Sequence, residues 1–148
     1  SVNDKDGISA ALMIVQIATD LKRESKTLND LLDEIWNKYG YHGTKQISVR
    51  VNTLEEISKI LGRFRNSTPQ SIAGYQVSGF DDLEKPTSDL PPTNGVRIFL
   101  EPNIRIIVRP SGTEPKIKCY IEVVSDSQEM AEKIIARLDF ELRTFLAS

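Results

Sequence analysis

The 148-residue chain is 39% hydrophobic and carries a formal net charge of −2. This length is typical of one ordinary domain, or of one domain with part of another, and it can bury a core without disulfides or metals. The slightly acidic balance argues against general nucleic-acid binding, which requires a basic face.

Cysteine usage and apolar runs bear on the compartment of the protein. The single cysteine, Cys119, excludes an internal disulfide. The first residues lack the basic and apolar regions of a signal peptide. The apolar run "AALMIV" is far shorter than the roughly 18 residues of a membrane span. We therefore expect a cytoplasmic protein that has neither nucleic acid nor membranes among its partners.

The first predicted element is a helix from Gly7 to Leu21 that is apolar on nearly all sides. Between Ile8 and Ala18 only Ser9 and Gln16 are polar. A helix without a polar face is normally buried on most sides. Two interpretations stay open: the rest of this chain covers the helix, or its packing partner belongs to a longer protein of which this chain is a piece.

A second helix is predicted from Leu28 to Tyr39, where apolar residues recur at i, i+3, i+4 and i+7. Thr27 is a candidate N-cap, and Gly40 is a candidate stop signal. The following stretch "YGYHG", residues 39–43, is interpreted as a linker.

After this linker the pattern changes to strands and amphipathic helices. Capping boxes at Thr53–Glu56 and Ser125–Gln128 open two predicted helices. Alternating apolar residues and turn signals predict five strands, at residues 47–51, 75–80, 96–100, 104–108 and 117–124. From residue 41 onward the chain is therefore predicted to be an α+β domain, a mostly antiparallel sheet with helices packed on one face.

The stretch "RPSGTEPKIK", Arg109–Lys118, joins the last two predicted strands and has more hydrogen-bonding groups than a turn requires. Because side chains alternate along a strand, Arg109, Lys116 and Lys118 share the face opposite the core, whereas Cys119 faces inward. Between Arg105 and Lys118 there are four cations and one acid, Glu114, a local excess of +3.

Ser111, Gly112 and Thr113 lie between these cations. Two hydroxyl donors, and backbone N–H groups that a ligand can approach past a residue without Cβ, favour an anion. Arginine and lysine complement a phosphate dianion. A solvated hairpin uses the same turn residues, so composition alone leaves phosphate binding and a plain turn as alternatives.

Two motifs resemble the α-D-phosphohexomutase superfamily of phosphoglucomutases and phosphomannomutases. "RPSGTEPKIKCYIE" resembles the phosphate-binding loop of that family. "NDKDGISAALM" resembles the KDG segment near the end of its third domain, in the phosphoglucomutase-2-like subgroup. The resemblance implies that residues 1–40 are the C-terminal helices of domain 3. Residues 41–148 would then be the C-terminal domain 4, with a TATA-box-binding-protein-like fold.

The family interconverts sugar 1-phosphates and 6-phosphates, or pentose 1- and 5-phosphates, through a bisphosphate intermediate. A phosphoserine exchanges the phosphate, and domain 4 holds the phosphate that is not reacting. The resemblance implies a sugar phosphate substrate, and the remaining domains of the parent enzyme as partners. It matches Lys5 with a family lysine near the reacting hydroxyl, a candidate catalytic residue. The phosphate ligands that it implies are Arg109, Ser111, Gly112, Thr113 and Lys118, with Lys116 as a further candidate.

Other parts of the family's pattern are missing from this sequence. It has no serine loop of the nucleophilic type and no Asp-rich "DGDGDR"-like segment for magnesium. Asp81, Asp82 and Asp89 lie in a Pro-rich loop and are interpreted as solvated charges, and His42 has no second histidine or cysteine nearby. We therefore expect Mg²⁺ only in the full-length parent, no metal or cofactor bound here, and no mutase activity from this chain alone. A stand-alone small-ligand-binding or protein-interaction module is the alternative.

Overall fold

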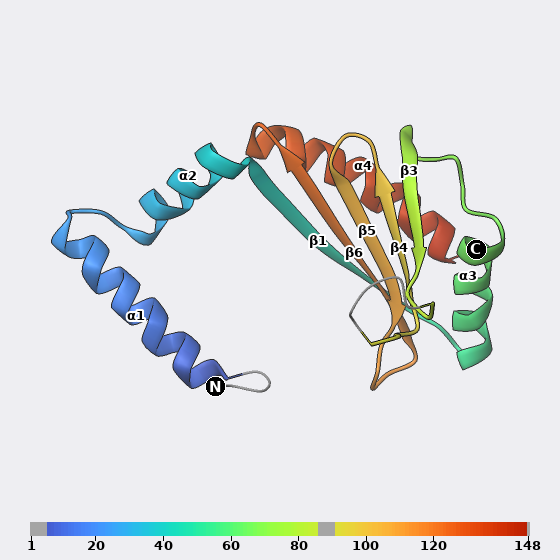
Figure 1. Ribbon diagram of the computed structural model, residues 1–148. Coiled ribbons are helices and arrows are strands. Elements are labelled where there is room, and N and C mark those ends of the chain that lie inside the picture. The colour runs from blue at the N-terminus through green and yellow to red at the C-terminus, as the bar shows by residue number, and fades with distance from the viewer. Residues whose placement is uncertain (1–5, 86–90, 148) are drawn as a thin grey trace. The chain divides into compact units, whose positions relative to one another are not determined.

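The computed structural model describes residues 6–85 and 91–147, and it divides after Gly40 into two compact units (Figure 1). The first unit contains α1 (Gly7–Arg23) and α2 (Leu28–Tyr39). The second contains β1 (Tyr41–Arg50), α3 (Leu54–Asn66), β2 (Ser71–Ile72), β3 (Tyr75–Asp82), β4 (Val96–Leu100), β5 (Ile104–Pro110), β6 (Lys116–Ser125) and α4 (Gln128–Ala147).

Both predicted helices of the first unit are confirmed, and local caps define their ends. The Asp6 carboxylate accepts hydrogen bonds from the N–H groups of Ile8 and Ser9, which begins α1. Thr27 and Asp30 form a reciprocal capping box at the start of α2. Within this unit α2 leaves the apolar side chains of α1 exposed. The most exposed are Ile8, Leu12, Met13, Ile14 and Val15, with exposed fractions of 52–79%.

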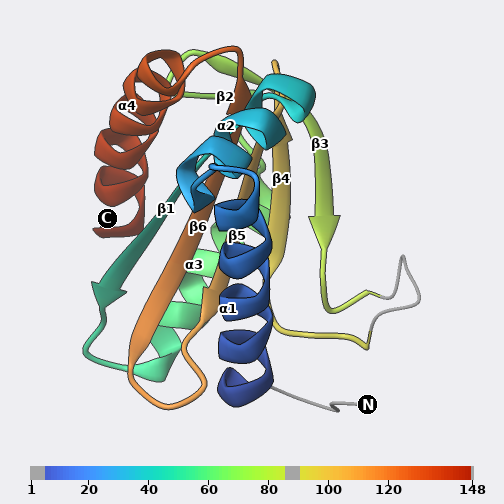
Figure 2. The same cartoon turned by 90° about the vertical axis from the view of Figure 1, so that its left-hand side faces the viewer.

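The second unit is a six-stranded sheet in the order β1-β6-β5-β4-β3-β2, and every pairing is antiparallel. The predicted α+β class is thus confirmed, and β2 is an additional short strand that was not among the predicted ones. The buried side chains of α3 and α4 share one core with the inward side chains of the sheet. Figure 2 shows α3 behind the central strands, so the opposite face of the sheet is not covered by these helices.

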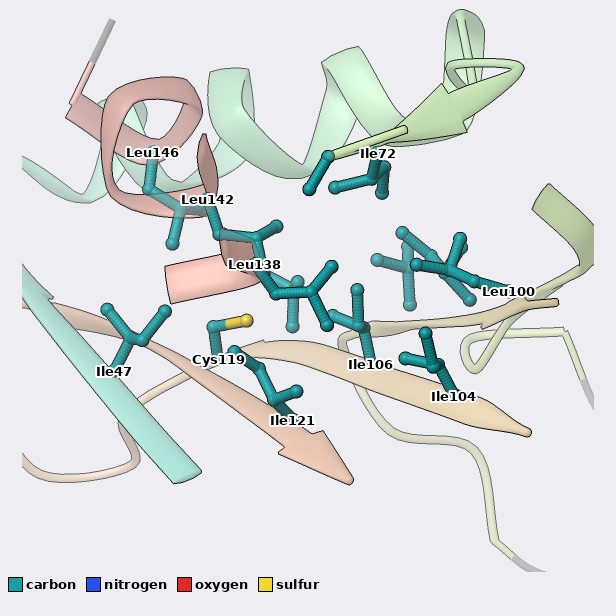
Figure 3. Close-up of a cluster of buried hydrophobic side chains, with 14 of the residues drawn as sticks. Ile47, Ile72, Leu100, Ile104, Ile106, Cys119, Ile121, Leu138, Leu142 and Leu146 are labelled. Carbon is teal, nitrogen blue, oxygen red and sulfur yellow. The ribbon is translucent and has the colours of Figure 1, made fainter. Parts of the chain in front are cut away.

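Strand alternation and helical periodicity correctly predicted several side chains of this core. Ile106 on β5, Cys119 on β6 and Leu138 on α4 are fully buried, and Figure 3 shows their side chains in one cluster. Burial in this apolar cluster raises the pKa of the Cys119 thiol to about 12. Cys119 is therefore a core residue and not a nucleophile.

The predicted linker at residues 39–43 is wrong beyond Gly40, because β1 begins at Tyr41 and pairs with β6 along its full length. Gly43 is a strand residue directly beneath α4. A Cβ added to Gly43 would lie 2.9 Å from Ala131 Cβ and 2.9 Å from Ile135 Cδ1. This glycine therefore allows helix and strand to approach closely, and it does not mark a flexible segment.

The interpretation of Asp81 and Asp82 as solvated loop charges is also wrong. Both lie in β3, and both form ion pairs with arginines of other elements. Asp81 Oδ2 lies 2.6 Å from Arg97 Nη2, and Asp82 Oδ1 lies 3.1 Å from Arg65 Nε. Antiparallel pairing of β3 with β4 places Asp81 opposite Arg97. Asp89 lies outside the described residues.

The two predicted capping boxes have different outcomes. Thr53 Oγ1 accepts a hydrogen bond from the N–H of Glu56, as predicted, although the Glu56 side chain returns to the N–H of Asn52. At α4 the capping hydroxyl belongs to Ser127, which accepts from the N–H of Met130. Ser125 instead ends β6 and donates to the Ser127 carbonyl, so the predicted box at Ser125 is wrong.

Candidate functional site

The loop between β5 and β6, residues 111–115, projects from the end of these two adjacent strands (Figure 1). The N–H of Ser111 donates to the Lys116 carbonyl at 2.8 Å and closes the hairpin. The N–H of Val51, just after β1, donates to the Pro115 carbonyl at 3.0 Å. Arg109 and Lys118 are Cα partners at the base of the loop. Three strand ends thus position a short, well-anchored loop.

The predicted cations share the face opposite the core, but acids neutralise two of the four. Arg105 forms an ion pair with Glu122, its Cα partner on β6. Lys116 Nζ lies 2.9 Å from both carboxylate oxygens of Glu114. Arg109 and Lys118, in contrast, form no ion pair with any residue in the described ranges. On this hairpin the positive charge without an acidic partner therefore lies on these two opposed residues, and Arg50 on the neighbouring β1 likewise forms no ion pair within the described ranges.

Glu114 is a local counter-ion within the loop. The hydrogen bond and charge of Lys116 hold the pKa of the Glu114 carboxyl below its usual value, with further contributions from Arg50 and Lys118. The carboxylate is therefore ionised at neutral pH. It forms hydrogen bonds with Lys116, whereas Lys118 acts on it only through its charge.

The tip of the loop presents backbone donors to open space. In the part of the chain that the structure describes, the N–H groups of Gly112, Thr113 and Glu114 have no hydrogen-bond partner. The backbone of Gly112 is outside the left-handed region, and an added Cβ would meet no atom within 4 Å. Neither backbone conformation nor packing within the protein thus requires a glycine here. The missing Cβ instead leaves room for a ligand to reach these N–H groups.

The guanidinium of Arg109 is held by neutral groups. Its Nη2 donates to the Tyr120 hydroxyl at 3.0 Å, and its Nη1 donates to the Pro110 carbonyl at 3.1 Å. Its Cζ lies 5.3 Å from the centroid of the Tyr120 ring, within the range of a cation–π contact. Arg109 therefore keeps its net charge available to an anion.

Two residues near the loop were not among the predicted ligands. Tyr120 contacts Arg109, as described above. Arg50, on β1, is the Cα partner of Lys116 and lies close enough to Glu114 to lower its pKa. The alternation in β1 predicted that Arg50 faces away from the core. However, no sequence signal revealed that β1 pairs with β6.

Other predicted site features fall outside this loop. Lys5 lies outside the described residues. His42 Nδ1 lies 3.4 Å from Glu122 Oε1 on the sheet. Within the described ranges no three residues among His, Cys, Asp and Glu gather as metal ligands would. No helix in those ranges combines the length and apolarity needed to cross a membrane.

Comparison with known proteins gives the same family as the two motifs. Residues 47–138 match the family model of the phosphoglucomutase/phosphomannomutase C-terminal domain. A probable phosphomannomutase from Haemophilus influenzae is 41% identical over 146 residues, which cover 98% of this chain and 29% of that protein. A phosphoglucomutase from Staphylococcus aureus is 35% identical over 93% of this chain and 27% of its own length. This chain thus spans less than a third of the length of these relatives.

A solved structure supports the fold independently. The crystal structure of pp63/parafusin, an exocytosis-sensitive phosphoprotein and phosphoglucomutase from Paramecium, superposes with a TM-score of 0.58 and covers 97% of this chain and 28% of that one. Its sequence identity of 21% shows likeness of fold alone. The family resemblance inferred from the loop and the KDG segment is confirmed by the family model and by the two relatives. The chain therefore belongs to the phosphoglucomutase/phosphomannomutase family and contains the C-terminal domain of such enzymes.

Proposed function

We propose that this chain is the substrate-phosphate-binding part of a phosphoglucomutase or phosphomannomutase, and that the loop Arg109–Lys118 holds the phosphate that is not reacting. The parent enzyme would interconvert sugar 1-phosphates and 6-phosphates, or pentose 1- and 5-phosphates, through a bisphosphate. The observation that carries this proposal is the pairing of Arg109 with Lys118, two cations without an acidic partner in the described residues.

Each group of the loop has a distinct role in this proposal. Arg109 supplies a planar fork for two phosphate oxygens, and Lys118 supplies a point charge. The third phosphate oxygen is surrounded by backbone N–H groups, from Gly112 and Thr113, and by hydroxyls, from Ser111 and Thr113. Lys116 takes part only if it leaves Glu114, so we assign it a secondary role. A phosphate ester carries about −1.5 to −2 charges at neutral pH, which this set would balance.

Holding a remote phosphate would help the reaction without touching the reacting atoms. Binding energy from the second phosphate orients the sugar so that its free hydroxyl meets the catalytic machinery, and this orientation lowers the entropic part of the barrier. The exchanging serine and the Mg²⁺ site would lie in other segments of the parent enzyme. We therefore expect no mutase turnover from these 148 residues alone.

The first unit has a related place in this proposal. We assign residues 1–40 to the end of domain 3 and residues 41–148 to domain 4, with the remaining domains of the parent enzyme as partners. The exposed apolar side chains of α1 and the division after Gly40 support this assignment. Lys5 would lie near the reacting hydroxyl as an acid–base or electrostatic helper. A cytoplasmic location is also part of the proposal and rests on the cysteine usage of the chain.

A titration followed by NMR tests the phosphate site. Glucose 6-phosphate is added to the chain, and the expected result is that the largest amide shifts fall on residues 111–114. Arg109→Ala should abolish these shifts. Arg105→Ala is the matched control, because it removes the same charge from the same face of β5 but from an arginine already paired with Glu122. Shifts centred elsewhere, or equal loss in both variants, would contradict the proposal.

A further inference from the structure

We infer that Tyr120 is a positioning residue for Arg109, which fixes the guanidinium so that its remaining donors face the phosphate of the substrate. This inference rests on the proposed function of the loop. It assigns a role to a residue that does not itself bind the phosphate. Tyr120 acts through the orientation and the freedom of movement of Arg109.

Two separate features of the Tyr120 side chain act on the same guanidinium. The hydroxyl accepts a hydrogen bond from Arg109 Nη2 at 3.0 Å, and the ring lies 5.3 Å from Arg109 Cζ. The strand register explains why they meet. Tyr120 is the Cα partner of Ile107, and Arg109 is the Cα partner of Lys118, so Tyr120 and Arg109 are diagonal neighbours on one face.

The stem of Arg109 is confined as well as its head. Gly95 packs so closely against this residue that an added Cβ would lie 3.1 Å from Arg109 Cβ and 3.0 Å from the Val108 carbonyl oxygen. The Gly95 carbonyl accepts a hydrogen bond from the N–H of Leu83, which holds this segment in place. Both ends of the Arg109 side chain therefore have fixed neighbours before any ligand arrives.

The neutrality of these contacts distinguishes Arg109 from the neighbouring arginines of β4 and β5 on the same face, Arg97 and Arg105. Arg97 and Arg105 are paired with Asp81 and Glu122. A carboxylate partner would orient a guanidinium but would also neutralise it and compete with phosphate. The Tyr120 phenol orients the guanidinium without neutralising it and without competing with phosphate. Of the five N–H donors of the guanidinium, one is used by Tyr120 and one by Pro110, which leaves three for an anion.

Pre-orientation should appear in affinity, because a side chain that is already ordered loses less entropy on binding. We expect Tyr120→Phe, which keeps the ring and removes the hydroxyl, to weaken binding of glucose 6-phosphate about threefold to fivefold. Tyr120→Leu, which removes both features, should weaken binding about tenfold or more.

The test is a double-mutant cycle with calorimetric affinities for glucose 6-phosphate. It uses the wild type, Arg109→Ala, Tyr120→Leu and the double variant, with Tyr120→Phe as the conservative variant. Phe99→Leu is the matched control, because it removes a ring beneath Arg97, which Asp81 already holds. An NMR signal of the Arg109 Nε–H group reports the ordering directly. It should broaden or shift in Tyr120→Leu and remain unchanged in Phe99→Leu.

The expected result is that Tyr120→Leu weakens binding in the wild-type background and has no further effect once Arg109 is alanine. Equal weakening in both backgrounds would overturn the inference, since Tyr120 would then act independently of Arg109. Normal binding in both Tyr120 variants, together with weak binding in Arg109→Ala, would overturn the inference and leave the proposed function standing. Normal binding in Arg109→Ala would overturn both.

Discussion

Two glycines allow one kind of substitution to test the fold and the loop separately. Gly43 lies in β1 beneath α4, where an added Cβ comes within 2.9 Å of Ala131 Cβ and Ile135 Cδ1. Gly112 lies at the tip of the loop, where an added Cβ meets no atom within 4 Å. We predict that Gly43→Ala lowers stability and leaves phosphate affinity intact. Gly112→Ala should weaken phosphate binding without lowering stability.

The expected loss of stability for Gly43→Ala follows from the two short contacts. Carbon atoms pack best at about 3.5–4.0 Å, so α4 must move away from β1 by a large fraction of an ångström. Ile135 can change its rotamer, but Ala131 Cβ is fixed to the helix backbone. Overpacking of this kind costs about 1–3 kcal/mol, and the reduced entropy of the unfolded chain offsets about 0.4–1 kcal/mol. The net loss is about 1–2 kcal/mol, or roughly 5–10 °C in Tm.

Thermal unfolding followed by circular dichroism measures the first effect, and calorimetric titration with glucose 6-phosphate measures the second. Gly112→Ala should unfold at or a few degrees above the temperature of the wild type, because the unfolded chain loses entropy and no clash offsets it. It should bind about tenfold more weakly, since its Cβ obstructs the backbone donors. Unchanged stability in Gly43→Ala would refute the close approach of α4. Unchanged affinity in Gly112→Ala would refute the need for room above the loop.

Three further predictions concern the core and the loop. The Cys119 thiol, with a pKa raised to about 12 by burial, should resist Ellman's reagent at pH 8 in the folded chain and react in urea; fast labelling of the folded chain would contradict its burial. Leu138→Ala should cost about 2–5 kcal/mol in a urea titration, because the side chain is fully buried, and a loss below 1 kcal/mol would refute that packing. Lys116 lowers the pKa of the Glu114 carboxyl in the folded chain. The ion pair therefore stabilises the loop fully above the ordinary pKa of a glutamate, and this stabilisation is lost as the pH falls through the lowered pKa of Glu114. Lys116→Met should therefore raise the pKa of Glu114 in an NMR titration, and an unchanged pKa would show that the two side chains do not interact in solution.

The central hairpin could be predicted from the sequence because its information is local. Alternation along β5 and β6 correctly assigned Ile106 and Cys119 to the core and Arg109 and Lys118 to the opposite face. The two strands are joined by a short loop, so their pairing follows from adjacency in the chain. The same local information identified the concentration of hydrogen-bond donors at the loop. The resemblance to the family motif then indicated that these donors bind phosphate.

Ion pairs between strands were not predicted. The count of four cations and one acid between Arg105 and Lys118 overestimated the free charge, because Glu122, the partner of Arg105, lies just outside that window. Likewise, Asp81 looked like a loop residue until β3 paired with β4 and placed it opposite Arg97. Ion pairs across strands depend on register, and periodicity alone does not fix register.

The two glycines near residue 40 were also misinterpreted, because the structural reason for a glycine differs from one position to the next. At Gly40 the backbone has a φ of 88°, which favours glycine and ends α2 as predicted. At Gly43, three residues later, glycine is needed for the packing of α4 on an extended strand. The sequence does not distinguish these two reasons, so residues 39–43 were interpreted as one linker.

The most direct test of the central claim is the affinity of the chain for glucose 6-phosphate, measured by calorimetry in Arg109→Ala and in Arg105→Ala. Arg109→Ala should weaken binding about tenfold or more, as expected for a lost charge-assisted pair, while Arg105→Ala should bind like the wild type. Equal affinities in the two variants would contradict it, because the loop would then attract anions by general charge and not through Arg109 and the groups around it.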